Sequence, residues 1–144
     1  MTTEPTTDLL PSQLRLAVTR LARRLRQEAG DVTASQLSAL ATVERLGSVS
    51  LRELADVERI SPPSTTRIVT GLEERGLVVR TVDAADRRVA RLAITDAGQE
   101  LLATARSRRD AYLASRLRAL SPAERETLAR ALPIFEGLLE GQNE

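Results

Sequence analysis

The stretch Ser61–Ile94, SPPSTTRIVTGLEERGLVVRTVDAADRRVARLAI, decides the fold of this chain. It predicts a helix, then a strand, a charged hairpin tip and a second strand. Ser61 is a candidate N-cap, and Pro62 follows at the first helical position, where a missing N–H costs nothing. Gly76 is placed to end the helix in the left-handed conformation.

The predicted helix has two unlike faces. Ile68, Val69 and Leu72 recur at helical spacing one turn after Thr65, so this side is expected to pack on the core. The opposite face is small, hydroxylated or cationic, and carries Pro63, Thr66, Arg67 and Thr70.

Two β-rich runs follow the helix, Leu77–Val82 and Val89–Ile94. The segment Asp83–Arg88 between them is too polar to bury and short enough for a hairpin loop. A helix with a small polar face beside a ribbon with a cationic tip can address a DNA major groove and its backbone or minor groove together.

The preceding residues predict two further helices. Thr33 with Gln36, and Ser50 with Glu53, form capping-box patterns at the helix starts. Gly47 is expected to end the first of these helices, and Ser48-Val49 can form a short strand. The second helix is short, ends near Val57 and leads directly to Ser61, which is the helix-turn-helix pattern. Its expected buried side consists of Leu51, Leu54, Ala55 and Val57.

Amphipathic helices are predicted at both ends of the chain. One spans Ser12–Glu28, and another runs from a Thr95 cap to Ala119. A capping box at Ser121 opens the last helix, whose apolar positions come close to a heptad seam. Pro133 lies inside this helix and predicts a kink there or a break into two segments.

The expected organisation is a single domain over residues 1–144, mainly α with a small β-hairpin wing. Residues 30–94 form a winged helix-turn-helix, and residues 1–29 and 95–144 supply dimerisation helices. The apolar stripes of the terminal helices exceed what a small winged helix can cover, which predicts an obligate homodimer with two-fold symmetry. The alternative is a monomer in which these helices fold back on the module.

Composition limits the chemistry. The 144 residues include no cysteine and no histidine. Thiolate and imidazole metal sites, thiol redox sensing and the usual general base are therefore missing. We found no nucleophile-plus-base spacing and no phosphate-cradling glycine loop, so an enzyme has little support, and no cofactor is expected. The sequence also has no membrane-length apolar run and no secretory signal, which predicts a cytoplasmic protein.

The net charge of the chain does not indicate nucleic-acid binding. The formal charge is +1, and residues 30–94 contain nine arginines and nine acids. Any DNA-binding argument must therefore rest on where the charges point. Near-neutrality keeps open an alternative, in which the winged helix is a protein-interaction module without specific DNA binding.

The whole pattern resembles the MarR family of bacterial transcription regulators, from about Leu14 to Leu139. Three segments in order carry the resemblance. They are LRELA at 51–55 leading to ISPPSTTRIV at 60–69, LEERGLV at 72–78, and DAADRR at 83–88 followed by LAITDAG at 92–98. The resemblance implies a homodimer that binds a pseudo-palindromic operator on double-stranded DNA, commonly represses transcription, and often releases DNA when a small-molecule effector binds.

The resemblance also implies roles for individual residues. The helix starting at Ser61 would enter the major groove, Arg88 would reach the minor groove or phosphates, Asp86 would orient Arg88, and Arg87 would contact the backbone. Asp86 and Arg88 could instead form an ordinary surface ion pair. Arg67 could read a guanine edge, grip phosphate or pair with a neighbouring glutamate. The candidate DNA-contacting residues are Ser61, Pro63, Ser64, Thr66, Arg67, Thr70, Asp86, Arg87 and Arg88.

The predicted effector site is less defined than the predicted DNA contacts. The resemblance places a pocket where the terminal helices meet the winged module, near Leu21, Leu25, Leu40 and Leu101. Helical spacing does not separate pocket residues from core residues there, and core is the favoured interpretation for each. Arg52 and Arg59 are further candidates for phosphate contact, with solvated surface as the alternative.

Overall fold

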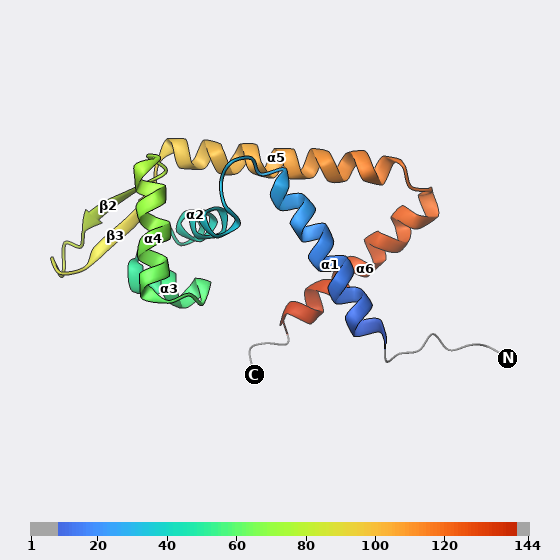
Figure 1. Ribbon diagram of the computed structural model, residues 1–144, viewed down its shortest axis with the longest axis horizontal. Coiled ribbons are helices and arrows are strands. Elements are labelled where there is room, and N and C mark those ends of the chain that lie inside the picture. The colour runs from blue at the N-terminus through green and yellow to red at the C-terminus, as the bar shows by residue number, and fades with distance from the viewer. Residues whose placement is uncertain (1–8, 141–144) are drawn as a thin grey trace. The chain divides into compact units, whose positions relative to one another are not determined.

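A computed structural model describes residues 9–140 of the chain (Figure 1). Within this range the chain forms two compact units, one ending at Arg109 and the other beginning at Asp110, inside a single long helix. The elements in chain order are α1 (Leu10–Gln27), α2 (Ala34–Leu46), β1 (Ser48–Ser50), α3 (Leu51–Glu58), α4 (Pro62–Glu74), β2 (Val78–Val82), β3 (Ala90–Ile94), α5 (Asp96–Arg118) and α6 (Pro122–Glu140).

The first unit is a winged helix. Helices α2, α3 and α4 pack together beside a three-stranded antiparallel sheet in the order β1-β3-β2. Leu92 at the centre of the sheet pairs with Val49 on one side and Arg80 on the other. The mainly helical fold with a small wing, and the short strand predicted at Ser48-Val49, are therefore confirmed.

The core of this unit draws on almost all of its elements. The side chains of Leu40, Leu54, Leu72 and Leu92 have no exposed surface, and Leu102 of α5 lies against the same cluster. Each fully buried leucine contributes about 2 kcal/mol of hydrophobic stabilisation. The first part of α5 thus belongs to the winged-helix core.

The predicted helix signals of this unit are largely confirmed. Thr33 and Gln36 form both bonds of a capping box, whereas Ser50 caps the amide of Glu53 without the return bond. Gly76 adopts a φ of 70°, and the amide of Leu77 donates to the carbonyl of Leu72 at 2.9 Å, which ends α4 in a Schellman turn. One core prediction was wrong: Val57 is 46% exposed, because α3 turns it away from the cluster that holds Leu54.

A tight joint links the start of α5 to the end of α4. The Thr95 hydroxyl donates to the carbonyl of Gly76 at 2.6 Å and accepts the amide of Gly98 at 3.1 Å. The Thr95 amide donates to the carbonyl of Leu77 at 3.1 Å. A Cβ at Gly98 would overlap that same carbonyl, so this position requires glycine for space.

The second unit contains the end of α5 and all of α6. Ser121 and Glu124 form both bonds of the predicted capping box. Helix α6 runs through Pro133 without interruption, so of the kink or break predicted there the break is absent, and the kink stays a prediction. The missing amide hydrogen bond is tolerated because the helix continues on both sides of Pro133. No residue of α6 is buried within the described chain.

Candidate DNA-binding surface

The start of α4 is built from hydroxyl groups. The Ser61 side chain accepts the amide of Ser64 at 3.3 Å and donates to its hydroxyl at 2.9 Å. Ser64 is half-buried, and Ser61 is exposed. These bonds fix the first turn of α4, so hydroxyls and the positive end of the helix dipole meet at one exposed point.

The outer face of α4 is open to solvent, as the sequence predicted. Pro63, Thr66, Arg67 and Thr70 are all exposed, whereas Thr65, Val69 and Leu72 are buried on the other side. The Thr66 hydroxyl donates to the carbonyl of Pro62 at 3.1 Å.

Arg67 has no ion-pair or hydrogen-bond partner within residues 9–140. The neighbouring carboxylate of Glu73 is instead bound by Arg80 of β2 at 2.6 Å. A local ion pair for Arg67, one of the alternatives that the sequence left open, is therefore not formed. Its guanidinium remains available to an external acceptor.

Side chains of α2 hold the turn between α3 and α4 in place. Hydroxyls of Ser38 and Thr42 on α2 donate to the carboxylate of Glu58 at 2.7 and 2.5 Å. The next residue, Arg59, has a φ of 53°, which is costly for a residue with a Cβ. Arg59 and Arg52 are both exposed beside α4, and neither guanidinium has a partner within the described residues.

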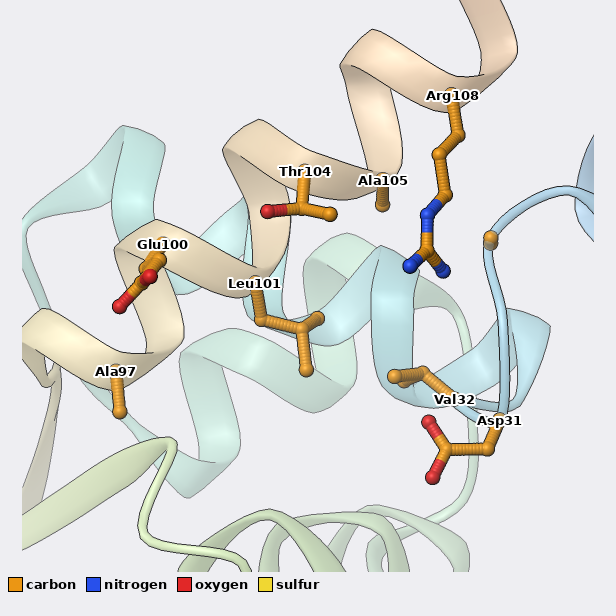
Figure 2. Close-up of a pocket in the computed structure, with 9 residues that line it drawn as sticks. Asp31, Val32, Ala97, Glu100, Leu101, Thr104, Ala105 and Arg108 are labelled. Atoms are coloured by element: carbon orange, nitrogen blue, oxygen red, sulfur yellow. The ribbon is translucent and has the colours of Figure 1, made fainter.

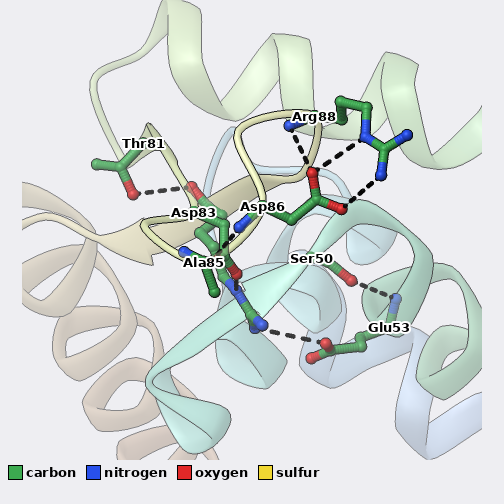
Figure 3. A network of polar contacts seen from close by, with 8 residues as sticks. Ser50, Glu53, Thr81, Asp83, Ala85, Asp86 and Arg88 are labelled. Carbon is green, nitrogen blue, oxygen red and sulfur yellow. Dashed lines mark hydrogen bonds and ion pairs between the residues drawn. The ribbon is translucent and has the colours of Figure 1, made fainter.

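The wing tip holds a carboxylate and an arginine together (Figure 3). Asp86 accepts both the amide and Nε of Arg88, at 3.0 and 3.2 Å. The Arg88 side chain is 91% exposed, so the contact orients the guanidinium without hiding it. Arg87 is also exposed, with no partner in the described part of the chain.

The base of the wing carries Asp83, the first residue of the DAADRR segment, and Arg91, for which the sequence predicted no role. Arg91 of β3 donates through Nε to Asp83 at 2.9 Å, and its Nη1 lies 3.4 Å from Glu53 of α3. This guanidinium, together with the amides of Ala85 and Asp86, lowers the pKa of the Asp83 carboxyl below its ordinary value of 3.8. The sequence does not indicate that these two residues pair, because Asp83 follows β2 and the register partner of Arg91 in β2 is Thr81.

A hollow of about 310 Å³ lies between the α1–α2 turn and α5 (Figure 2). Figure 2 shows Val32 and Leu101 approaching one another from opposite walls, with Arg108 reaching toward the turn and Glu100 at the other end. Of the four leucines expected near a pocket, only Leu101 lines this hollow; Leu40 is core. The remaining lining residues are Ala29, Asp31, Ala97, Thr104 and Ala105.

Two other kinds of site were searched for in the same part of the chain. Residues 9–140 contain no cluster of three or more acidic side chains placed to hold a metal ion. None of their helices combines the length and the apolar character needed to cross a bilayer.

Comparison with known proteins matches this geometry to a family. The family model described as "MarR family" matches residues 32–90. An HTH-type transcriptional regulator of Mycobacterium bovis is 38% identical over 133 residues, covering 91% of this chain and 93% of the relative.

The chain belongs to the MarR family. A putative transcriptional regulator from Pseudomonas aeruginosa has a solved structure that superimposes with a TM-score of 0.84 at 35% identity, covering 94% of this chain and 98% of that one. The HTH-type transcriptional repressor MdtR of Bacillus subtilis is 32% identical over 97 residues, or 63% of each chain. These names describe DNA-binding transcriptional regulators and not enzymes, which confirms the resemblance seen in the sequence.

Proposed function

We propose that this MarR-family chain is a homodimeric repressor that binds a pseudo-palindromic operator on double-stranded DNA. The observation that carries the proposal is the pair of open cationic groups in one unit, Arg67 on α4 and Arg88 on the wing. Helix α4 enters the major groove with its Ser61, Pro63, Ser64, Thr66, Arg67 and Thr70 face. Repression is supported by the name of the B. subtilis relative.

The wing supplies a second contact. Arg88 gains most in a narrow, A·T-rich minor groove, where the negative potential is enhanced. Asp86 holds its guanidinium in one direction, and Arg87 contacts the phosphate backbone. Because Arg88 is almost fully exposed, it loses few contacts within the chain when it meets DNA.

Selection of bound sequences from a random duplex pool tests this function. We expect recovered sequences to hold two related half-sites about one helical turn apart. Arg88→Ala should then lower affinity for a selected duplex roughly tenfold or more in gel-shift titrations at fixed salt. Recovery of no preferred sequence would contradict specific binding.

Homodimerisation is supported by apolar surface that the chain leaves open. In α1, Val18 and Leu21 are exposed, and in α6, Leu128, Leu132 and Leu139 are exposed. Exposed apolar side chains concentrated on helices are typical of a subunit interface. Two copies that bury these faces on each other place two α4 helices on one duplex.

A small apolar or amphiphilic effector is proposed to loosen DNA binding from the hollow beside α5. The hollow is at the small end of ligand pockets, with an apolar wall and the Arg108 guanidinium as a polar handle. An effector acts only if it binds the DNA-free arrangement more tightly than the DNA-bound one. A thermal-shift and gel-shift screen should find compounds whose effects Arg108→Ala removes, and a screen without any would leave the hollow unused.

A second candidate function is a protein-interaction module. It is favoured by the balanced charges of residues 30–94. The slope of log affinity against log salt, measured on random-sequence DNA, separates the two functions. Phosphate neutralisation gives a steep slope, and a protein-interaction module gives almost none.

A further inference from the structure

An unbroken chain of polar contacts joins the wing tip to the helix-turn-helix (Figure 3). It begins at Glu53 in the first turn of α3, where Nη1 of Arg91 lies 3.4 Å from Oε1. It continues through Nε of Arg91, which donates to Oδ2 of Asp83 at 2.9 Å. Arg91 therefore bridges β3, the start of the hairpin loop and α3.

The other oxygen of Asp83 shapes the tip itself. Oδ1 accepts the amides of Ala85 and Asp86, at 2.7 and 3.3 Å. The carboxylate of Asp86 in turn holds the amide and Nε of Arg88. The direction of the Arg88 guanidinium thus depends on Asp83, and Asp83 is held by Arg91.

We propose that Arg91 is a positioning residue for DNA binding, which fixes the orientation of the wing tip relative to α3 and α4 and acts on DNA only through Arg88. This inference rests on the DNA contact proposed above for Arg88. The backbone bonds of the hairpin continue past the strands, with the Asp83 amide donating to the Val89 carbonyl at 2.9 Å and the Val89 amide donating to the Asp86 carbonyl at 3.0 Å, but they tie the tip only to its own hairpin. The Arg91 contacts are the link from the loop to a helix.

The chemistry of this link suits an arginine. A guanidinium presents several donors in a rigid fork and can bind two carboxylates on different elements at once, whereas an ammonium is a single point charge. The Arg91 and Asp83 side chains are 33% and 17% exposed, far less than Arg88. The hydrogen bond from Arg91 is the largest cause of the lowered pKa of the Asp83 carboxyl, ahead of the two loop amides.

Arg80 provides a matched control. It lies in β2 and is 35% exposed, and it pairs with one carboxylate, that of Glu73, at 2.6 Å. It resembles Arg91 in residue type, exposure and ion pairing, but its contacts lead to α4 and not to the wing tip. Arg80→Met therefore reports the cost of losing an arginine ion pair from the same hairpin.

A double-mutant cycle tests the proposal with the full-length protein and a duplex recovered by selection from a random pool. Arg91→Met is measured in the parent and in an Arg88→Ala background. We expect it to weaken binding roughly three- to tenfold in the parent and to have almost no further effect once Arg88 is absent. Arg80→Met should cost the same small factor in both backgrounds. Arg91→Lys, which retains the charge without the fork, should restore only part of the affinity.

Each outcome separates this inference from the proposed function. If Arg88→Ala binds as tightly as the parent, Arg88 does not contact DNA. The proposed contact of the wing and the role of Arg91 are then both overturned. If Arg88→Ala loses affinity and Arg91→Met costs the same factor in both backgrounds, or costs nothing, only the positioning role is overturned. Should Arg91→Met unfold, Glu53→Gln, which cuts the link at its exposed end, must show the same dependence on Arg88 or the proposal is wrong.

Discussion

The winged-helix unit and helix α6 differ in the interactions that stabilise them. The unit ending at Arg109 buries leucines from α2, α3, α4, β3 and α5 in one cluster. Helix α6 has a complete capping box and an internal ion pair between Glu126 and Arg130, yet buries no side chain. Local signals are enough to define the helix, but tertiary packing normally provides most of a helix's stability. The winged helix therefore forms its core within one chain, whereas α6 leaves its apolar side chains uncovered within residues 9–140, as expected if the proposed dimer buries them.

Leu132→Glu should have the largest effect of the variants considered, because it tests whether the exposed face of α6 forms the dimer. A charge at a side chain that is 59% exposed in one chain is harmless to the winged helix, but a dimer interface would bury it without a partner. We expect dissociation to monomers in sedimentation experiments and a loss of operator affinity of roughly 100-fold, because one α4 no longer helps the other to bind.

The control for Leu132→Glu is Gly137→Glu in the same helix. A Cβ at Gly137 meets nothing within 4 Å, and the position is about 140° around the helix from Leu132. This variant should remain dimeric. If both variants stay dimeric, the exposed face of α6 is not the interface.

Leu54→Ala tests the stability of the winged-helix core. Leu54 is fully buried in the winged-helix core, so removing its methyl groups should cost about 2–5 kcal/mol of unfolding free energy. Chemical denaturation followed by circular dichroism measures this loss. Leu139→Ala, at an exposed position of α6, should change the dimer dissociation constant but not the stability of the winged helix.

Arg59→Gly should separate stability from function inside the winged helix. Glycine adopts the positive φ of this turn without strain, so unfolding free energy should hold or rise by about 0.5 kcal/mol. Operator affinity should fall, and the salt slope should decrease by about one, if Arg59 contacts phosphate. Arg59→Ala, which keeps the strain, should lose the affinity without the gain in stability. An unchanged salt slope in both variants would assign Arg59 to solvated surface.

The smallest effect is expected from lowering the pH, which protonates Asp83 at the base of the wing. The Asp83 pKa is lowered by Arg91 of β3 and by two loop amides, with Glu53 of α3 also facing Arg91. A lowered pKa means that the contact stabilises the wing fully above the ordinary value of 3.8 and is lost as pH falls through the lower folded value. NMR titration should show the wing amides shifting only in that acidic range. Asp83→Asn should abolish this titration, and its persistence would place the titrating group elsewhere.

Much of the fold could be predicted because its signals are local. The caps at Thr33, Ser61 and Ser121 and the turn at Gly76 depend on residues within one turn of each other, and all are formed. Val57 was wrongly placed in the core because helical spacing defines a stripe but not its width. Of the kink or break predicted at Pro133, the break is absent, because the helical turns on either side of the proline hold the helix together.

The candidate site was only partly predictable. The α4 face and the Asp86–Arg88 pair follow from periodicity and from a motif within one loop, and their geometry was found as expected, although their contact with DNA stays a prediction. The link from Arg91 to Glu53 joins residues 38 positions apart, and nothing in the sequence indicates which carboxylate Arg91 will pair with. Contacts of this kind appear only when the sheet register is known.

The joint at Thr95 has a mechanical consequence. Three hydrogen bonds and the absence of a Cβ at Gly98 fasten the base of α5 to the last turn of α4. If α5 tilts, this short joint would pass the tilt to α4, the helix proposed to read the operator. A change of angle in a subunit's longest helix would thereby become a change of pitch at the groove.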